Sequence, residues 1–195
     1  LHLCNKNMEN MDTNNNDGKA KHDLLLDVCM AAKYEGESLI HYHEQYQQSY
    51  PGSDFPMCTM LARSFADIGD IVRGKDLYSG NNKEKKQRKK LDDKLKKIFD
   101  KIKKSDNKLT SLKDDQIREY WWALNRKEVW KAITCGAPDD SKYFRGTCGG
   151  SGKTGTQAKK QCRCDDKPSG GKTGKGSGDV NIVPTYFDYV PQYLR

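Results

Sequence analysis

Apolar residues recur at helical spacing along the first third of the chain. Between residues 22 and 48 they stand three, four or seven positions apart, at Leu25, Cys29, Ala32, Leu39 and His43. This spacing predicts a long amphipathic helix, which the turn sequence YPGS at residues 50–53 ends. A second helix is predicted over residues 57–72 and stops before Gly74, with its apolar face at Met57, Met60, Leu61, Phe65, Ile68 and Val72.

The third apolar pattern is the sharpest in the chain. It follows a predicted turn at residues 80–82 and has offsets of 0, 4, 7, 8 and 11, at Leu91, Leu95, Ile98, Phe99 and Ile102. The opposite face carries Lys94, Lys97, Lys101 and Lys104. A fourth helix is predicted to begin near Ser111, where SLKD resembles a capping box. Its buried face is expected at Ile117, Tyr120, Trp121, Leu124, Trp130 and Ile133.

The rest of the chain predicts irregular structure. Residues 149–178 are dominated by Gly, Ser, Thr and Lys, so we expect a flexible loop with little core of its own, anchored at most by Cys162 and Cys164. The aromatic stretch at residues 180–195 contains Pro184 and Pro191, which prevent one uninterrupted helix. Because no segment alternates as a strand would, the predicted fold class is all-α with long irregular loops.

Positive charge is concentrated in one part of the sequence. The chain has 195 residues and a net charge of +8. Residues 83–104 hold twelve Lys and Arg against four Asp and Glu, so these 22 residues carry the whole excess. A concentrated excess predicts one positive face, and the alternative is a solvated, lysine-rich helix surface with no ligand.

Seven cysteines are dispersed along the chain: Cys4, Cys29, Cys58, Cys135, Cys148, Cys162 and Cys164. A zinc site usually shows paired cysteines with two to four residues between them, whereas Cys162 and Cys164 enclose only one and have no second pair. Dispersed cysteines at this density favour disulfides formed in an oxidising compartment. The odd number suggests that one partner lies outside this sequence.

The sequence contains no catalytic constellation. GKT at residues 152–154 and 171–173 resembles the end of a phosphate-binding loop, but the required earlier glycine is replaced by Thr147 and Asp166. His41 and His43 point to different helix faces, so they do not form a metal pair. We therefore expect no enzyme, no metal and no cofactor. Nucleic-acid signatures are missing, and no apolar run is long enough for membrane insertion.

Several long motifs resemble one family. Residues 61–74, LARSFADIGDIVRG, resemble the hallmark segment of Duffy-binding-like domains, and residues 183–195, VPTYFDYVPQYLR, resemble the hallmark of their alpha subclass. Residues 27–36, 120–126, 129–135 and 143–148 are similar to the same subclass and stand in the right order. The resemblance covers nearly the whole chain and implies the head region of a Plasmodium falciparum variant erythrocyte membrane protein.

What the resemblance implies is a disulfide-linked helical adhesion module. It would be displayed on the extracellular face of the infected erythrocyte membrane, as part of a larger anchored protein. Its partners would be host erythrocyte glycans of the heparan-sulfate type or receptor proteins, as in rosetting, together with neighbouring domains of the same parent chain. Residues 1–54 would be a subdomain 1-like part and residues 55–195 a subdomain 2-like bundle, with the third subdomain absent. The alternative function is a structural scaffold piece that has no ligand of its own.

We assign the hallmark motifs to the fold rather than to binding. Trp121, Trp122 and Trp130 are expected to anchor the core, because large aromatic residues dominate packing in helical bundles. A disulfide is predicted between Cys58 and Cys135, which flank hallmark motifs at the start of one helix and the end of another. Ligand binding is predicted on the basic strip, whose members face away from the apolar residues: Lys85, Lys86, Arg88, Lys89, Lys90, Lys94, Lys97 and Lys101.

Overall fold

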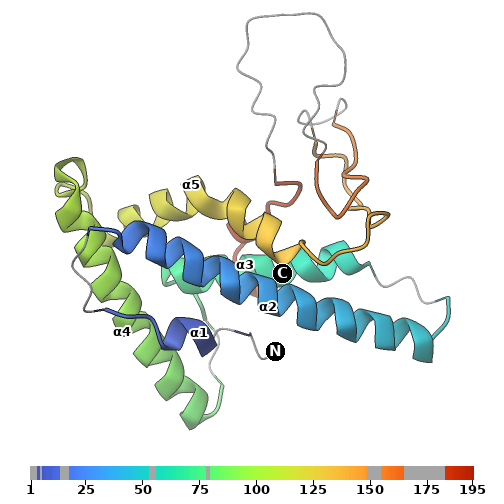
Figure 1. The fold of residues 1–195 in the computed structure, drawn as a ribbon, viewed down its shortest axis with the longest axis horizontal. Helices are drawn as coiled ribbons and strands as arrows, with labels where there is room; N and C mark the ends of the chain where they lie inside the picture. The colour runs from blue at the N-terminus through green and yellow to red at the C-terminus, as the bar shows by residue number, and fades with distance from the viewer. Residues whose placement is uncertain are drawn as a thin grey trace, which may run out of the picture.

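A computed structural model describes residues 4, 6–13, 18–52, 56–77, 80–148, 155–164 and 183–195. Figure 1 shows long helices packed around one another, with α2 crossing beside α5 and α4 lying at one end of the molecule. The elements follow in this order: α1 (Lys6–Glu9), α2 (Ala20–Ser49), α3 (Met57–Arg73), α4 (Asn82–Ser105), η1 (Asn107–Leu109), α5 (Asp114–Ile133), η3 (Phe187–Tyr189) and η4 (Gln192–Leu194). Within the described ranges there is no strand, only two isolated β-bridges. The all-α prediction is confirmed.

The helix boundaries follow local capping signals. α3 ends where Gly74 adopts a left-handed φ of 73° and its N–H bonds back to Asp70 and Ile71. α4 begins earlier than its apolar pattern, because Asn81 and Glu84 form a reciprocal capping box. The capping box expected at Ser111 is wrong, because α5 begins at Asp114. Its first turn is instead capped by Gln116, whose side-chain oxygen accepts a hydrogen bond from the N–H of Lys113.

α5 is the central helix of the core. It packs against both α2 and α3, and Trp122, Trp130 and Trp121 on it are 0%, 2% and 4% exposed. The prediction that these tryptophans anchor the core is confirmed. The expected burial of Tyr120 and Leu124 is wrong, because they are 59% and 80% exposed while Trp122 and Val129 take the buried face.

At Gly36, α2 comes very close to the backbone at the end of α5. A Cβ added at this position would overlap the backbone carbonyl of Ile133. Four positions later, Ile40 reaches Gly136, just beyond the end of α5. A side chain of any size at residue 36 would therefore separate the two helices.

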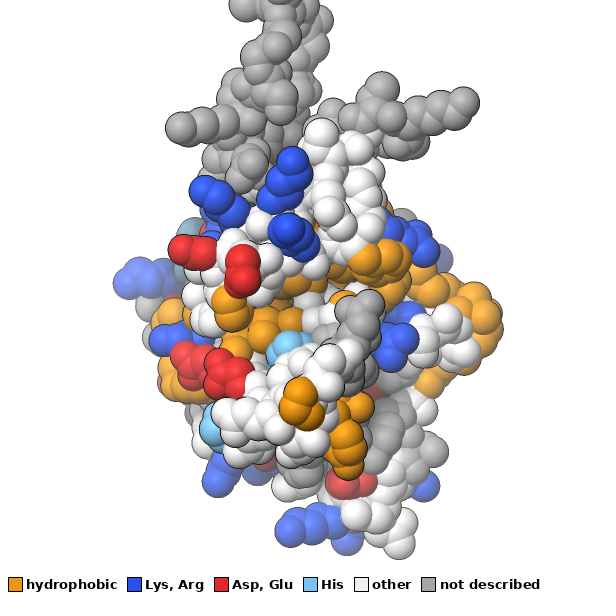
Figure 2. Space-filling view, turned by 90° about the vertical axis from the view of Figure 1, so that its right-hand side faces the viewer, with side chains coloured by type: hydrophobic (Ala, Val, Ile, Leu, Met, Phe, Trp, Pro, Cys, Tyr) orange, Lys and Arg blue, Asp and Glu red, His pale blue; other side chains and the backbone are white. Residues whose placement is uncertain are grey.

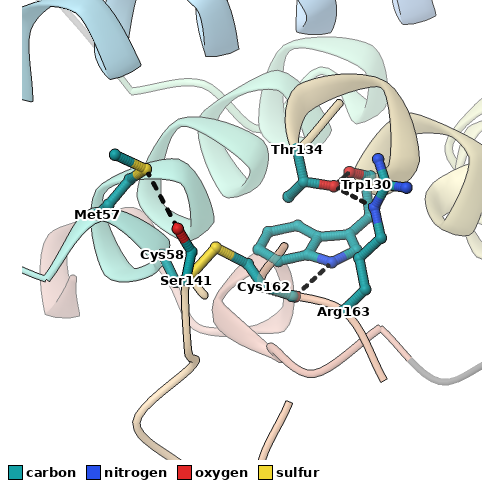
Figure 3. Close-up of a disulfide and its surroundings, with 7 residues drawn as sticks. All are labelled: Met57, Cys58, Trp130, Thr134, Ser141, Cys162 and Arg163. Carbon is teal, nitrogen blue, oxygen red and sulfur yellow. Dashed lines mark hydrogen bonds between the residues drawn. A yellow bond between two sulfur atoms is a disulfide. The ribbon is translucent and has the colours of Figure 1, made fainter. Parts of the chain in front are cut away.

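The predicted disulfide between Cys58 and Cys135 is wrong. Cys58 instead bonds to Cys162, and Cys148 bonds to Cys164, while Cys135 is an exposed free thiol. The reason is the path of the chain after α5: Trp130 donates to the carbonyl of Cys162 at 3.1 Å, which places that cysteine against the start of α3 (Figure 3).

Neighbouring side chains fix this arrangement. The Arg163 guanidinium donates to Thr134 Oγ1 at 2.7 Å, and Ser141 Oγ lies 3.8 Å from Met57 Sδ (Figure 3). The Cys58–Cys162 bond joins residues 104 positions apart, which corresponds to about 4.7 kcal/mol in the chain-entropy model. It is therefore a major covalent constraint on the core.

The predicted loop at residues 149–178 falls largely outside the described residues. In its described part, residues 155–164, Ala158 and Cys162 are fully buried and belong to the same core as the helices. That core also includes Met8 and Val183, so it draws on nearly the full length of the chain. The division into parts at residues 1–54 and 55–195 stays a prediction. In the part of the chain that the structure describes, no helix is long and apolar enough to cross a membrane.

Candidate binding surface on helix α4

The inner face of α4 determines which way its lysines point. Leu91, Leu95, Ile98, Phe99 and Ile102 are all at most 5% exposed and pack against α2, α5 and the short α1. With 3.6 residues per turn, the intervening positions must turn outward. The sequence of α4 thus separates a buried apolar stripe from a charged outer surface.

Five of the eight predicted strip residues lie free on this outer surface. These side chains are exposed, and within the described chain none of them makes an ion pair or a side-chain hydrogen bond: Lys85, Lys86, Lys89, Lys90 and Lys97. We call these five residues the open strip. Four of them line a shallow depression of about 430 Å³ together with Lys94 and Asp93. Asp93 is the one carboxylate among the side chains that line this depression.

The other three predicted residues are engaged within the fold. Lys94 is half-buried, and its Nζ donates to the backbone carbonyls of Glu9 at 2.5 Å and Met11 at 3.1 Å, which holds the end of α1 against α4. Arg88 forms an ion pair with Asp76, and burial lowers the pKa of Arg88. Lys101 is half-buried. The structure therefore brings the open strip together and withdraws Lys94 and Arg88 from it.

On the edge of α4 that faces α5, positive and negative side chains are paired with one another. Asp92 accepts from Lys96 at 2.7 Å and from Arg118 at 3.1 Å. Partial burial pushes the pKa of Asp92 up, but the hydrogen bond from Lys96 and the charge of Arg118 outweigh it, so the pKa lies below its ordinary value. The uncompensated positive charge is thus on the outer surface and not at this edge.

In contrast to the open strip, another group of charged residues lies in the interior, where the hallmark segments at residues 61–74 and 183–195 meet. Asp188, 1% exposed, accepts two hydrogen bonds from the Arg126 guanidinium at 2.7 and 2.8 Å and one from Trp122 Nε1 at 2.9 Å. Arg73 donates to the carbonyl of Asp188 and pairs with Asp70 at 3.0 Å. We call these five residues the Asp188 cluster. It ties η3 to α3 and α5, so the hallmark motifs serve the fold, as their assignment in the sequence suggested.

Arg195 extends these contacts to the last residue. It pairs with Asp67 at 3.3 Å and with Asp70. Burial raises the pKa of both carboxyls, although the guanidinium of Arg195 opposes the shift. The final segment is thereby held on α3.

Comparison with known proteins decides the family. The family model for the Duffy binding domain matches residues 1–195. The chain belongs to the Duffy-binding domain family. No curated protein matches it.

Two solved structures from Plasmodium falciparum are similar over nearly the whole chain. One is the NTS-DBL1α-1 domain of PfEMP1 from the varO strain, with 35% identity, a TM-score of 0.72, and coverage of 99% of this chain and 40% of that one. The other is the NTS-DBL1α and CIDRγ double domain of varO PfEMP1, with the same identity and TM-score and 25% of that chain covered. These matches confirm the resemblance to the alpha subclass. The chain spans less than half the length of either structure.

A DBLβ domain is similar over a shorter part of the chain. The ICAM-1-binding DBLβ domain of IT4var13 PfEMP1 has 35% identity and a TM-score of 0.58, with 69% of this chain and 33% of that chain covered. The same domain bound to ICAM-1 has 33% identity and a TM-score of 0.54. The DBLβ domain of IT4var13 PfEMP1 thus binds the protein ICAM-1.

Sequence reasoning missed the internal roles of Lys94 and Arg88. Their partners are Glu9, Met11 and Asp76. The first two belong to the polar, Asn-rich segment at residues 5–17, whose composition predicts a loop. Met8 and Met11 are buried and were the available signal that this segment packs on the core. An apolar pair inside a polar stretch indicates a docked segment, and a nearby lysine can then bind its carbonyls.

Proposed function

We propose that this chain is a host-receptor-binding adhesion module of the infected erythrocyte surface, and that the open strip on α4 binds sulfated glycans of the heparan-sulfate type on red cells, as in rosetting. Membership of the Duffy-binding family and similarity to PfEMP1 domains support the adhesion class, which is not an enzyme class. The observation that carries the glycan assignment is the gathering of five exposed lysines on one face.

The physical basis of this binding is multivalent electrostatics. Lys86 and Lys97 are eleven residues apart, or about 16 Å along the helix. A polyanion lying along this face releases counterions at every contact, which makes the binding favourable and dependent on salt. Each exposed contact contributes at most about 1 kcal/mol, so affinity comes from the number of lysines engaged.

The test replaces three lysines of the open strip, Lys86→Glu, Lys90→Glu and Lys97→Glu. The matched control replaces three exposed lysines elsewhere, Lys21→Glu, Lys108→Glu and Lys159→Glu, so both triple variants lower the net charge from +8 to +2. We expect the strip variant to elute from heparin at much lower salt than the control, with the helix content of both unchanged by circular dichroism. Equal elution of the two variants would show that bulk charge alone retains the protein, and the strip assignment would fall.

A scaffold role is the second candidate. The chain spans 40% of the NTS-DBL1α-1 structure and 25% of the double-domain structure, so the ligand surface of a longer parent protein can lie on neighbouring domains. In that case, the chain positions those domains and has no ligand of its own. This role predicts that the chain is retained on heparin no more strongly than a protein of equal net charge.

A further inference from the structure

A hollow lies at the opposite end of the molecule from α4. It lies open to the surface between the last turns of α2, the start of α3 and the turn that follows α5, and its volume is about 580 Å³. Figure 2 looks onto this end and shows a recess with hydrophobic side chains at its base and charged side chains around it. A recess of this size holds one or two side chains of a bound peptide.

The base and the rim of the hollow differ in chemistry. Pro56, Met57 and Pro138 contribute apolar surface. The rim carries Glu44 from α2 and Asp140 from the turn after α5, with Lys142 as the opposing cation. All three charged side chains are exposed, and in the described part of the chain none of them forms an ion pair or a hydrogen bond.

The helix end adds to the negative potential at the rim. The last turn of α2 contains no basic residue that would offset the partial negative charge of its terminal carbonyls. Two carboxylates and a helix C-terminus therefore outweigh the single lysine. A cationic group is the complementary ligand.

We propose that this hollow binds an arginine or lysine side chain presented by a loop of a protein partner. The long aliphatic stem of such a side chain would lie on the apolar base, and its charged head would reach Glu44 and Asp140 at the rim. A purely apolar ligand would leave both carboxylates unpaired, and an anionic ligand would be repelled by them. The charge pattern thus selects the basic side chain.

The tyrosines on the last turns of α2 indicate that the partner is a protein. Tyr42, Tyr46 and Tyr50 form a row of neighbouring rings, with centroids 6.4 and 5.0 Å apart, and Tyr42 and Tyr50 are 56% and 60% exposed. Exposed tyrosines are enriched at protein interfaces because they add large contact area at low entropic cost. This surface is separate from the open strip, so the result of either test does not affect the other proposal.

The test uses the blocked tripeptide acetyl-Ala-Arg-Ala-amide as the probe. Its analogue with citrulline in place of arginine has nearly the same shape and no charge. We expect the arginine peptide to shift the backbone amide resonances of Glu44, Ser141 and Lys142 in a ¹H–¹⁵N NMR titration of the full chain, and added salt to weaken the effect. The citrulline peptide and acetyl-Ala-Glu-Ala-amide are expected to bind at least about fivefold more weakly.

Substitutions then locate the site. The pair Glu44→Gln and Asp140→Asn should remove the preference for arginine over citrulline. The matched pair Glu37→Gln and Asp139→Asn makes the same charge change at two exposed residues that do not line the hollow, and it should preserve the preference. Equal shifts with the arginine and citrulline peptides, stronger binding of the glutamate peptide, or loss of preference in the control pair would each overturn the proposal. Retained chemical-shift dispersion shows that both variants are folded.

Discussion

The Asp188 cluster and the open strip both depend on basic side chains, but they use them in opposite ways. In the cluster, Arg73 and Arg126 meet carboxylates and a backbone carbonyl in the interior, at distances of 2.7 to 3.0 Å in most contacts. On α4, the five lysines of the open strip are exposed and make no ion pair or side-chain hydrogen bond within the described chain. The difference separates charge that specifies the fold from charge that is available to a ligand.

The choice of residue type follows the same division. Arginine offers a planar fork that matches a carboxylate with two hydrogen bonds, as Arg126 does with Asp188. Lysine is a strongly hydrated point charge on a flexible stem, suited to repeated weak contacts with a polyanion. A change in the cluster should therefore alter stability, and a change in the strip should alter binding.

The largest effect is expected from Trp122→Ala. This side chain is fully buried, contacts Gly69 and Phe65, and donates to Asp188, so its removal leaves a cavity and takes one hydrogen bond from a buried carboxylate. We expect a loss of about 4 kcal/mol in the free energy of unfolding. Tyr120→Ala, two positions earlier and 59% exposed, should change it by less than about 0.5 kcal/mol. Urea denaturation of both variants checks the contrast, and similar midpoints would contradict the assigned roles of the two faces of α5.

An intermediate effect is expected from Asp188→Asn. The amide keeps the size of the side chain but removes the charge that two nitrogens of Arg126 contact, which leaves a largely buried cation without its counterion. The expected loss is about 2–3 kcal/mol. Asp93→Asn on the outer surface of α4 removes the same charge and should stay within about 0.5 kcal/mol. Equal decreases in melting temperature for the two variants would show that the burial of Asp188 does not make its charge more important for stability than that of Asp93.

The smallest effect separates two residues of the same helix. Lys94→Ala frees the carbonyls of Glu9 and Met11 and should cost about 1 kcal/mol, with faster hydrogen exchange in α1. Lys97→Ala removes an exposed side chain of the open strip and should leave both stability and exchange unchanged within about 0.5 kcal/mol. Heparin elution should respond in the opposite order, with Lys97→Ala lowering the salt needed more than Lys94→Ala. The same order in both measurements would place Lys94 in the strip after all.

Periodicity predicted the helices well because each buries one stripe of apolar side chains. The stripe Leu91 to Ile102 gave the buried face of α4 correctly, and the outward direction of Lys97 followed from it. The same pattern could not distinguish Lys94 from Lys97, because the carbonyls that bind Lys94 belong to residues more than 80 positions away. Contacts between distant segments leave no periodic signal.

Two other predictions failed for related reasons. On α5, adjacent tryptophans at 121 and 122 allow two apolar faces, and the position of Gly69 under Trp122 decides between them. For Cys58, both Cys135 and Cys162 were available in the sequence. Cys162 pairs with Cys58 because its backbone carbonyl binds Trp130, which places it near the start of α3. The spacing of residues in the sequence does not predict such a contact between distant segments.

The two segments that meet at Gly36 continue to the walls of the distant hollow. Beyond this glycine, α2 continues to Glu44 and the chain after α5 continues to Asp140, so the two walls of the hollow extend from a single helix crossing. Glu44 lies eight residues beyond Gly36, about 12 Å along the helix. A methyl group at residue 36 would push the two walls apart at their common base, and a one-carbon difference at a buried position would thereby change which side chains fit a surface site that it never touches.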